Sequence, residues 1–431
     1  MADYRFETFE PGLADGAPDA QTTAYLQAVQ AGFHEPRLEE EPLGDKVRRS
    51  MLDGRKFTAA YVDRQPEYAL DPAVPVATFA HFEKEFNVGG GNLVDAHLIT
   101  WVTVRPTHRR RGLLRALMTQ NLAHAATAGN PFAVLTATEG GIYRRFGFGR
   151  ATWIQRVEVD TSPGFALAVE PDRRVEMCDP QVLRELAPQI YAQYMRKFPG
   201  AAGRQQSYVE RAAGSLDLDT GKPDPKVRAA LHFDEAGAPD GFVSYKISGW
   251  DDWTATIDII DLVAVSDAAY SALWGYLGAI DLVNRVRYPA AATDSPLSWL
   301  LADPRRMTVK AVEDSEWLRI LDVPQALEAR PWGLMGKLTL SVTDSLGFGA
   351  GVFELTAADG RGTVVRLADE PDDARADLSL DIAELGSLYL GGADPAVLSR
   401  AGRIRAARPE VVAQARAMFA LERLPYSPND F

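Results

Sequence analysis

The segment Val102-Thr-Val-Arg-Pro-Thr-His-Arg-Arg-Arg-Gly-Leu-Leu-Arg115 decides the fold of the chain around it. The β-branched run that ends at Val104 is typical of a strand, and Arg105-Pro106 ends it because proline cannot donate to a β-ladder. From Arg110 onward, leucine, methionine and alanine recur at three- and four-residue steps and predict an amphipathic helix. That helix is expected to stop at Gly129-Asn-Pro131.

The flanking segments complete a strand–helix–strand unit. Thr78 to Phe86 alternates as a strand does, and the glycine-rich segment from Asn87 to Asn92 predicts a hairpin turn. Downstream, Phe132 to Ala137 is a short apolar run of the kind found inside a central sheet. Since the helix joins this run to the strand Ala96 to Val104, we expect a βαβ unit with a right-handed crossover.

The loop between the strand and the helix has the composition of an anion site. A helix N-terminus presents unpaired backbone N–H groups and a partial positive charge, and Gly112 would let a pyrophosphate approach the backbone closely. Charge-assisted contacts, including contacts to a 3′-phosphate, can come from four arginines: Arg109, Arg110, Arg111 and Arg115. A basic helix cap on a solvated surface would have the same composition, so the arginines alone leave both interpretations open.

The region from about residue 155 to 312 repeats this order of elements. Strands are expected at 241–247 and 256–264, with a helix at 267–277. The short connection between the second strand and the helix contains neither arginine nor glycine. We therefore expect a second domain of similar shape that lacks the phosphate site and binds no cofactor.

The last region mixes strands and helices in the manner of an α+β domain. It opens with a strand-like segment from Trp317 to Asp322, continues with strands at 336–342 and 351–356, and ends with helices that include 411–421. The expected domains are therefore residues 1–154, 155–312 and 313–431, the first two of α/β class and the third of α+β class.

Composition limits the possible partners. A chain of 431 residues exceeds what one hydrophobic core usually organises. The net charge of −13 argues against nucleic acid, because phosphate backbones repel such a surface, and is compatible with a cationic substrate. The single cysteine, Cys178, can form neither an intramolecular disulfide nor a multi-thiolate metal site, which favours a cytoplasmic location.

Several functional classes are disfavoured by what the sequence lacks. No apolar run reaches the ~18 residues of a membrane span, and the acidic N-terminal segment lacks the basic start and apolar run of a signal peptide. The sequence contains neither G-x-x-x-x-G-K-[ST] nor H-E-x-x-H. We therefore expect no membrane span and no metal.

The arginine loop is similar to the pyrophosphate loop of the GNAT acetyltransferases, whose pattern is [QR]-x-x-G-x-[GA]. Leu114 departs from that pattern, which expects glycine or alanine there. The longer string from Thr103 to Arg115, however, resembles the enhanced intracellular survival (Eis) family, which tolerates leucine at this position. The strings Thr138-Glu-Gly-Gly-Ile-Tyr-Arg-Arg-Phe-Gly-Phe-Gly149 and Leu385-Gly-Ser-Leu-Tyr-Leu-Gly391 resemble the same family, so the similarity spans the chain.

The resemblance implies a tandem pair of GNAT domains, each a mixed sheet with flanking helices, followed by a domain similar to sterol carrier proteins. It also implies acetyl-coenzyme A (acetyl-CoA) as co-substrate and assembly as a homohexamer. The acceptors it implies are small polycationic amines such as aminoglycosides, sometimes acetylated at several positions.

The resemblance also assigns roles to individual residues. The general acid would be Tyr143, and the general base would be the terminal carboxylate of Phe431. Phe33 and Glu35 would border the substrate, although Glu35 is equally compatible with a solvated acidic loop. The cofactor-binding residues would be Val102, Thr103, Val104, Arg109, Arg110, Arg111, Gly112, Leu113, Leu114, Arg115, Thr138 and Glu139.

The chemistry needs both an acid and a base. An amine of pKa ~10.4 is almost wholly protonated at neutral pH and must lose a proton before it attacks a thioester. The leaving thiolate departs more readily when a phenol protonates it. A sensor for acyl-CoA, or a carrier of a lipid-like ligand, would need neither group, so their presence favours an enzyme. A protein lysine acetyltransferase remains the alternative within the enzyme class.

Overall fold

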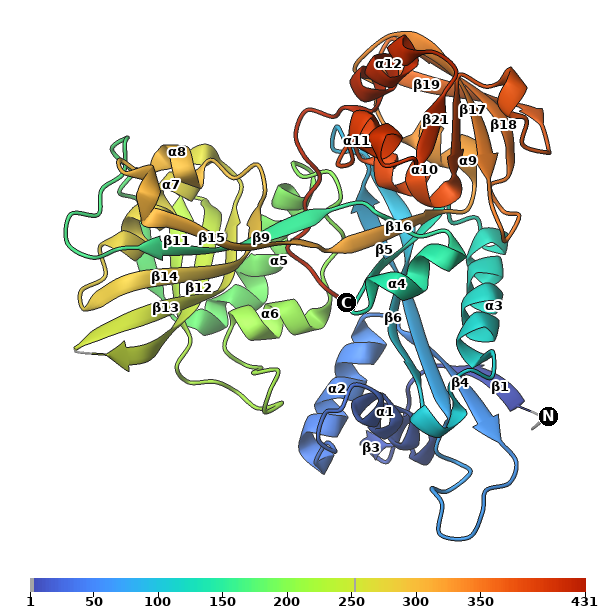
Figure 1. Ribbon diagram of the computed structural model, residues 1–431. Helices are drawn as coiled ribbons and strands as arrows, with labels where there is room; N and C mark the ends of the chain where they lie inside the picture. The colour runs from blue at the N-terminus through green and yellow to red at the C-terminus, as the bar shows by residue number, and fades with distance from the viewer. Residues whose placement is uncertain (1–3, 252) are drawn as a thin grey trace.

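The computed structural model describes residues 4–251 and 253–431, which form two seven-stranded sheets, one five-stranded sheet and a two-stranded ribbon. Figure 1 shows three lobes: the N-terminal domain in blue to cyan, the second domain in green to yellow, and the third in orange to red. None of the helices in the described ranges is long and apolar enough to cross a membrane.

The first domain contains the predicted βαβ unit. Its elements are β1 (Tyr4–Phe9), β2 (Leu13–Ala14), β3 (Ala17–Pro18), α1 (Ala20–Gly32), α2 (Glu40–Leu52), β4 (Lys56–Val62), β5 (Ala77–Asn87), β6 (Leu93–Val104), α3 (Leu113–Thr127), β7 (Phe132–Thr136), α4 (Gly140–Tyr143) and β8 (Gly149–Arg150). The hairpin between β5 and β6 is confirmed, and the three glycines of its turn all have positive φ. The parallel pairing of β6 with β7 confirms the crossover expected through α3.

Helices cover both faces of this sheet. Alternate residues of β4 point to opposite faces: Phe57 and Ala59 pack with α1 and α2, whereas Ala60 packs with α3. Helix α3 begins at Leu113 rather than at the expected Arg110. Arg110 has φ of 61° and Gly112 has φ of 84°, and a left-handed backbone cannot continue into an α-helix.

The second domain has the elements β9 (Trp153–Asp160), β10 (Val175–Cys178), α5 (Leu183–Met195), α6 (Gln206–Ala212), β11 (Arg228–Phe233), β12 (Pro239–Asp251), β13 (Thr254–Ala264), α7 (Asp267–Gly278), β14 (Val283–Ala292), α8 (Leu297–Leu300) and β15 (Met307–Asp314). The predicted strands correspond to β12 and β13, and the predicted helix to α7. As in the first domain, a parallel pair, β13 and β14, lies within an otherwise antiparallel sheet.

The third domain contains α9 (Val323–Ala329), β17 (Gly336–Thr343), β18 (Gly351–Ala358), β19 (Arg361–Ala368), β20 (Leu378–Asp381), α10 (Ile382–Tyr389), α11 (Pro395–Arg400), β21 (Ile404–Ala406) and α12 (Pro409–Phe419). Its sheet has the order β19-β18-β17-β20-β21. Its core is continuous with that of the first domain, because Leu98 and Phe132 share one apolar cluster with Leu340 and Leu385.

The chain passes between the two large sheets twice, through β9 and through β16. The first has the order β1-β4-β5-β6-β7-β16-β8 and the second β10-β11-β12-β13-β14-β9-β15. Strand β16 (Glu316–Ile320) belongs to the segment that we expected to open the third domain, and it pairs instead with β7 and β8 of the first. Strand β9, which directly follows β8 of the first sheet, lies between β14 and β15 of the second. Figure 1 shows both strands crossing between the lobes.

Candidate active site

The central strands β6 and β7 separate toward one edge of the first sheet. They pair only where His97–Ile99 meets Ala133–Leu135. Beyond that point β6 has one extra residue relative to β5, because the register moves from Ala80↔Thr100 to Thr78↔Thr103, and Trp101 has φ of 52°. A bulge of this kind bends the strand and changes where its side chains point.

A cavity of about 980 Å³, named here the arginine cavity, lies where the strands have separated. It is bordered by residues proposed from the sequence: Phe33, Val102, Thr103, Val104, Arg109, Arg110, Gly112, Leu113, Leu114, Arg115, Thr138, Glu139 and Tyr143. Arg111 is not among its wall residues, and its Nη1 donates to the Tyr4 hydroxyl on β1 at 3.3 Å. The structure therefore brings together the expected cofactor-binding residues except Arg111.

The N-terminus of α3 opens onto this cavity without a side-chain cap. Its N-cap is Gly112, and a Cβ built there would meet no heavy atom within 4 Å, so the space in front of the backbone is open. The first backbone N–H that makes a helical hydrogen bond is that of Ala116, which donates to Gly112 O at 2.9 Å. The preceding N–H groups form the type of helix terminus that binds anions.

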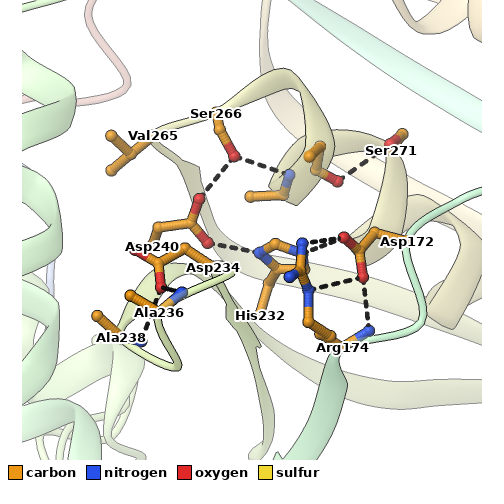
Figure 2. Close-up of polar contacts among 12 residues, drawn as sticks. Asp172, Arg174, His232, Asp234, Ala236, Ala238, Asp240, Val265, Ser266 and Ser271 are labelled. Atoms are coloured by element: carbon orange, nitrogen blue, oxygen red, sulfur yellow. Dashed lines mark hydrogen bonds and ion pairs between the residues drawn. The ribbon is translucent and has the colours of Figure 1, made fainter.

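The corresponding helix of the second domain, α7, is arranged differently (Figure 2). Its N-cap is Ser266, whose Oγ accepts a hydrogen bond from Ala269 N–H at 3.0 Å and donates to Asp240 Oδ2 at 2.6 Å. The other oxygen of Asp240 lies 2.5 Å from Nδ1 of the buried His232. A carboxylate of the protein thus faces the positive end of α7, where a phosphate would be repelled.

Tyr143 is the last residue of the short helix α4 and lies on the wall of the arginine cavity. Its side chain is buried, with the ring edge-to-face against Phe148 at 6.2 Å between centroids. Burial, followed by the nearby charge of Glu139, raises the pKa of the Tyr143 phenol above its ordinary value. The phenol therefore remains protonated at neutral pH and can donate a proton.

The third domain fixes the segment that carries Tyr143. The buried Glu384 of α10 accepts hydrogen bonds from Arg144 and Arg403, each at 2.9 Å. Arg319 of β16 donates from Nε to Phe146 O at 2.7 Å. A Cβ at Gly149 would lie 1.7 Å from a backbone oxygen of α10. The glycines after Tyr143 therefore reflect close packing between domains rather than contact with a ligand.

The C-terminal tail is firmly held and runs from the third domain to the junction of the other two (Figure 1). Asn429 is buried and donates from Nδ2 to the Tyr191 hydroxyl at 2.7 Å and to Ala202 O at 2.9 Å. The next residue, Asp430, donates its N–H to the Tyr208 hydroxyl at 2.6 Å. The second domain thereby positions the end of the chain.

Phe431 is bound to the first domain through Thr136, at the end of β7. Thr136 Oγ1 donates to Phe431 O at 2.6 Å and accepts a hydrogen bond from the Phe431 N–H at 3.2 Å. The ring of Phe431 packs edge-to-face against Phe82 of β5, at 6.0 Å between centroids. Phe431 is thus placed where β6 and β7 have separated.

Two further cavities follow in series: one adjoins the arginine cavity, and the other adjoins that one. The first, named here the junction cavity, is about 400 Å³, and its walls include Tyr143, Phe431, Phe33 and Glu35. The second, named here the α2 cavity, is about 640 Å³ and shares Glu35 and Phe431 with the junction cavity. The proposed acid, the proposed base and both proposed substrate residues therefore border the junction cavity.

Sequence reasoning missed several wall residues. Trp101 and Lys46 border both the junction cavity and the α2 cavity, and so does Asp430. Ser345 and Leu346, from the third domain, border the arginine cavity. Trp101 directly precedes the motif that decides the fold and could have been included, whereas no local pattern points to the other four.

We compared the chain with known proteins. Residues 18–151 and 200–320 match acetyltransferase (GNAT) domains, and residues 323–428 match a sterol carrier protein domain. The solved structure of Eis1 from Mycobacterium abscessus superposes with a TM-score of 0.80 at 28% identity, covering 100% of both chains. These matches confirm two GNAT domains followed by a sterol-carrier-like domain.

Similarity to relatives extends over most of the sequence. An uncharacterized N-acetyltransferase of Streptomyces griseus is 34% identical over 424 residues, which are 96% of this chain and 98% of the relative. The N-acetyltransferase Eis of Mycobacterium tuberculosis is 34% identical over 333 residues, 75% of this chain and 77% of the relative. The chain therefore belongs to the Eis family of GNAT N-acetyltransferases.

Proposed function

We propose that this N-acetyltransferase moves an acetyl group from acetyl-CoA to an amine of a small polycationic molecule. The observation that supports this most directly is the junction cavity, which is bordered by both the Tyr143 phenol and Phe431 of the chain end. Because this cavity adjoins the arginine cavity, a thioester held beside β6 would lie next to an acid and a base.

The residues of the arginine cavity fit acetyl-CoA. The uncapped start of α3 and the open space at Gly112 suit a pyrophosphate, with Arg109, Arg110 and Arg115 able to add charge-assisted contacts. The backbone of residues 102–104, beyond the last β6–β7 pair, would hold the pantetheine arm. When bound, acetyl-CoA would supply the reactive thioester, and the rest of the chemistry falls to side chains and the chain end.

The proton transfers follow from the two groups at the junction cavity. The terminal carboxylate of Phe431, held by Thr136, accepts the proton that the acceptor ammonium must lose before attack. The neutral amine then attacks the thioester carbonyl carbon, a C–N bond forms, and the C–S bond breaks. The Tyr143 phenol gives its proton to the departing sulfur, a role that suits its raised pKa. The acylated nitrogen passes its second proton to the phenolate so formed, and the Phe431 carboxylate returns the first proton to solvent.

Acidic groups near the junction support a cationic acceptor. Glu35 borders both the junction cavity and the α2 cavity, and Asp430 lies beside the terminal carboxylate on the same wall. Negative potential at a cavity mouth concentrates cationic ligands. Aminoglycosides and linear polyamines are therefore the first acceptors to test, and a molecule with several amines could be acetylated more than once.

A thiol-release assay tests the proposal. The full chain with acetyl-CoA should release free thiol with aminoglycosides and polyamines in the panel, and mass spectrometry should show one or more added acetyl groups. Lysine peptides in the same panel test the protein acetyltransferase alternative. Binding of acetyl-CoA without turnover of any amine would refute the proposed activity and favour a sensor.

We also propose assembly as a homohexamer in the cytoplasm. Membership in the Eis family supports the hexamer, and the single cysteine supports the cytoplasmic location. Among the described residues, no group of three or more His, Cys, Asp or Glu side chains is placed to hold a metal ion.

A further inference from the structure

One wall of the α2 cavity is basic rather than acidic. Lys46 of α2 and Arg55, which directly precedes β4, both border this cavity. They lie against the same indole, with the Arg55 guanidinium carbon 4.3 Å and Lys46 Nζ 5.0 Å from the Trp101 ring centroid. We name this pair and the indole the cationic corner. Two cations placed this close together repel each other unless an anion lies between them.

Arg55 is only partly neutralised by the protein. Its side chain is buried, 8% exposed, between the rings of Trp101 and Phe82. Its nearest carboxylate is Asp53, with Nε 3.6 Å from Oδ2, and neither Nε nor Nη1 makes a hydrogen bond within the described structure. Asp53 is also shared, because Lys84 Nζ lies 3.6 Å from its other oxygen. Buried guanidinium N–H groups without partners are costly unless a ligand supplies acceptors.

Lys46 has no carboxylate partner in the described part of the chain. Its Nζ donates to Gln30 Oε1 at 2.7 Å, a neutral acceptor. Arg49, one turn further along α2, is already paired with Glu210 at 3.0 Å. Burial, followed by the charges of Arg55 and Arg49, lowers the pKa of Lys46 to about 8, and Glu35 acts weakly in the opposite direction. An oxyanion bound beside Lys46 would stabilise the charged form of its ammonium group.

The cationic corner lies within reach of the reaction centre. The Phe82 ring lies between Arg55 and Phe431. The centroid of the Phe82 ring is 4.8 Å from the Arg55 guanidinium carbon and 6.0 Å from the centroid of the Phe431 ring. Lys46, Arg55 and Phe431 all border the α2 cavity, whose volume of about 640 Å³ suits a small molecule. One acceptor can therefore place an amine at the terminal carboxylate and another group at the corner.

We infer that the preferred acceptor carries an oxyanion, a carboxylate or a phosphate, in addition to its reactive amine, and that Lys46 and Arg55 bind this oxyanion. The inference rests on the proposed N-acetyltransferase function and changes its preferred acceptor from a plain polycation to an amine that also carries an acidic group. Polycations without an acidic group would leave the corner unpaired and would therefore be weaker acceptors.

Matched acceptor pairs test the inference. Lysine differs from cadaverine by its carboxylate, and glucosamine 6-phosphate differs from glucosamine by its phosphate, so the two pairs also distinguish the two oxyanions. We expect kcat/KM to be about 10-fold or more higher for the member with the oxyanion in at least one pair, mainly through KM, since charge-assisted hydrogen bonds are worth this much. An aminoglycoside in the same assay gives the polycation reference.

Variants of the cationic corner test the same assignment, with a third variant on α2 as the control. Lys46→Met and Arg55→Gln should each reduce the preference for the oxyanion about 10-fold while leaving CoA affinity unchanged. Arg48→Gln removes an exposed cation of α2 that is paired with Asp45, and it should change neither the preference for the oxyanion nor the CoA affinity. Thermal unfolding of each variant checks the fold, and Lys46→Met, at a partly exposed position, decides the question should Arg55→Gln fail to fold.

The outcomes separate this inference from the proposed function. Equal kcat/KM values within both pairs, or a preference that survives in Lys46→Met, would overturn the inference while the enzyme still turns over polycations. Should no amine be acetylated, calorimetric titration of the same pairs in the presence of CoA replaces turnover. Tighter binding of the oxyanion member that is lost in Lys46→Met would then support the corner, and equal binding would overturn it.

Discussion

The terminal carboxylate can be tested by adding a single glycine after Phe431. The addition converts that carboxylate into a neutral peptide carbonyl and moves the negative charge about 3.8 Å further along the chain. The present position depends on Thr136, whose hydroxyl contacts both O and N of Phe431, at 2.6 and 3.2 Å. General base catalysis contributes ~10²–10⁴-fold, so we expect kcat to fall at least ~10²-fold. CoA affinity should be unchanged, because the start of α3 remains intact.

The assay is thiol release at saturating acetyl-CoA with the best acceptor found, together with calorimetry of CoA binding. The same glycine added at the N-terminus is the matched control and should leave kcat unaltered. Thr136→Val, which removes the hydroxyl but not the carboxylate, should lower kcat about 10-fold, and Thr136→Ser should restore it. Wild-type turnover by the C-terminally extended chain would show that the base lies elsewhere, with Glu35 the next candidate.

Four further predictions concern the acid, the cofactor and the assembly. Tyr143→Phe should lower kcat ~10²-fold or more with unchanged CoA affinity. Because burial raises the pKa of the Tyr143 phenol, the wild-type enzyme should keep this acid protonated through neutral pH and lose the proton only above pH 10. A fall in kcat at lower pH that Tyr143→Phe abolishes would contradict this. Gly112→Trp should weaken CoA binding about 100-fold by filling the open space and straining a φ of 84°, and an unchanged calorimetric Kd would refute it. Titration should give one CoA per chain, because Asp240 faces the start of α7, whereas two would count against that reasoning. Light scattering should give the mass of a hexamer at micromolar concentration, and a monomer would exclude it.

The first domain depends on the last region of the chain for part of its sheet. Removal of residues 313–431 deletes β16 from the middle of the first sheet, between β7 and β8, and also removes the tail that ends in Phe431. It would expose the edges of β7 and β8. It would also uncover the apolar residues of the first domain that pack against the third. The activity and binding tests above therefore use the complete chain.

The sequence by itself determined the local architecture of the first domain. The order β5, turn, β6, arginine loop, α3 and β7 was predictable because neighbouring residues in the chain produce it, through periodicity and through turn residues at fixed positions. The family strings then pointed to the residues that border the arginine cavity, and most of those named do border it. The start of β6 was misplaced by three residues, at Ala96 instead of Leu93, and the start of α3 by three as well. The positive φ of Arg110, which delays α3, leaves no signal in the sequence.

Only the tertiary structure decided the rest of the site. Phe431 lies beside Thr136 although 295 positions separate them in the chain, and β16 enters a sheet whose other strands all end before residue 151. Lys46 of α2 and Arg55, which precedes β4, meet on Trp101 of β6. Contacts between distant segments depend on how whole elements pack, and packing imposes no period or spacing on the residues that meet. The acceptor side of the site, which is built from such contacts, therefore became visible only in the folded chain.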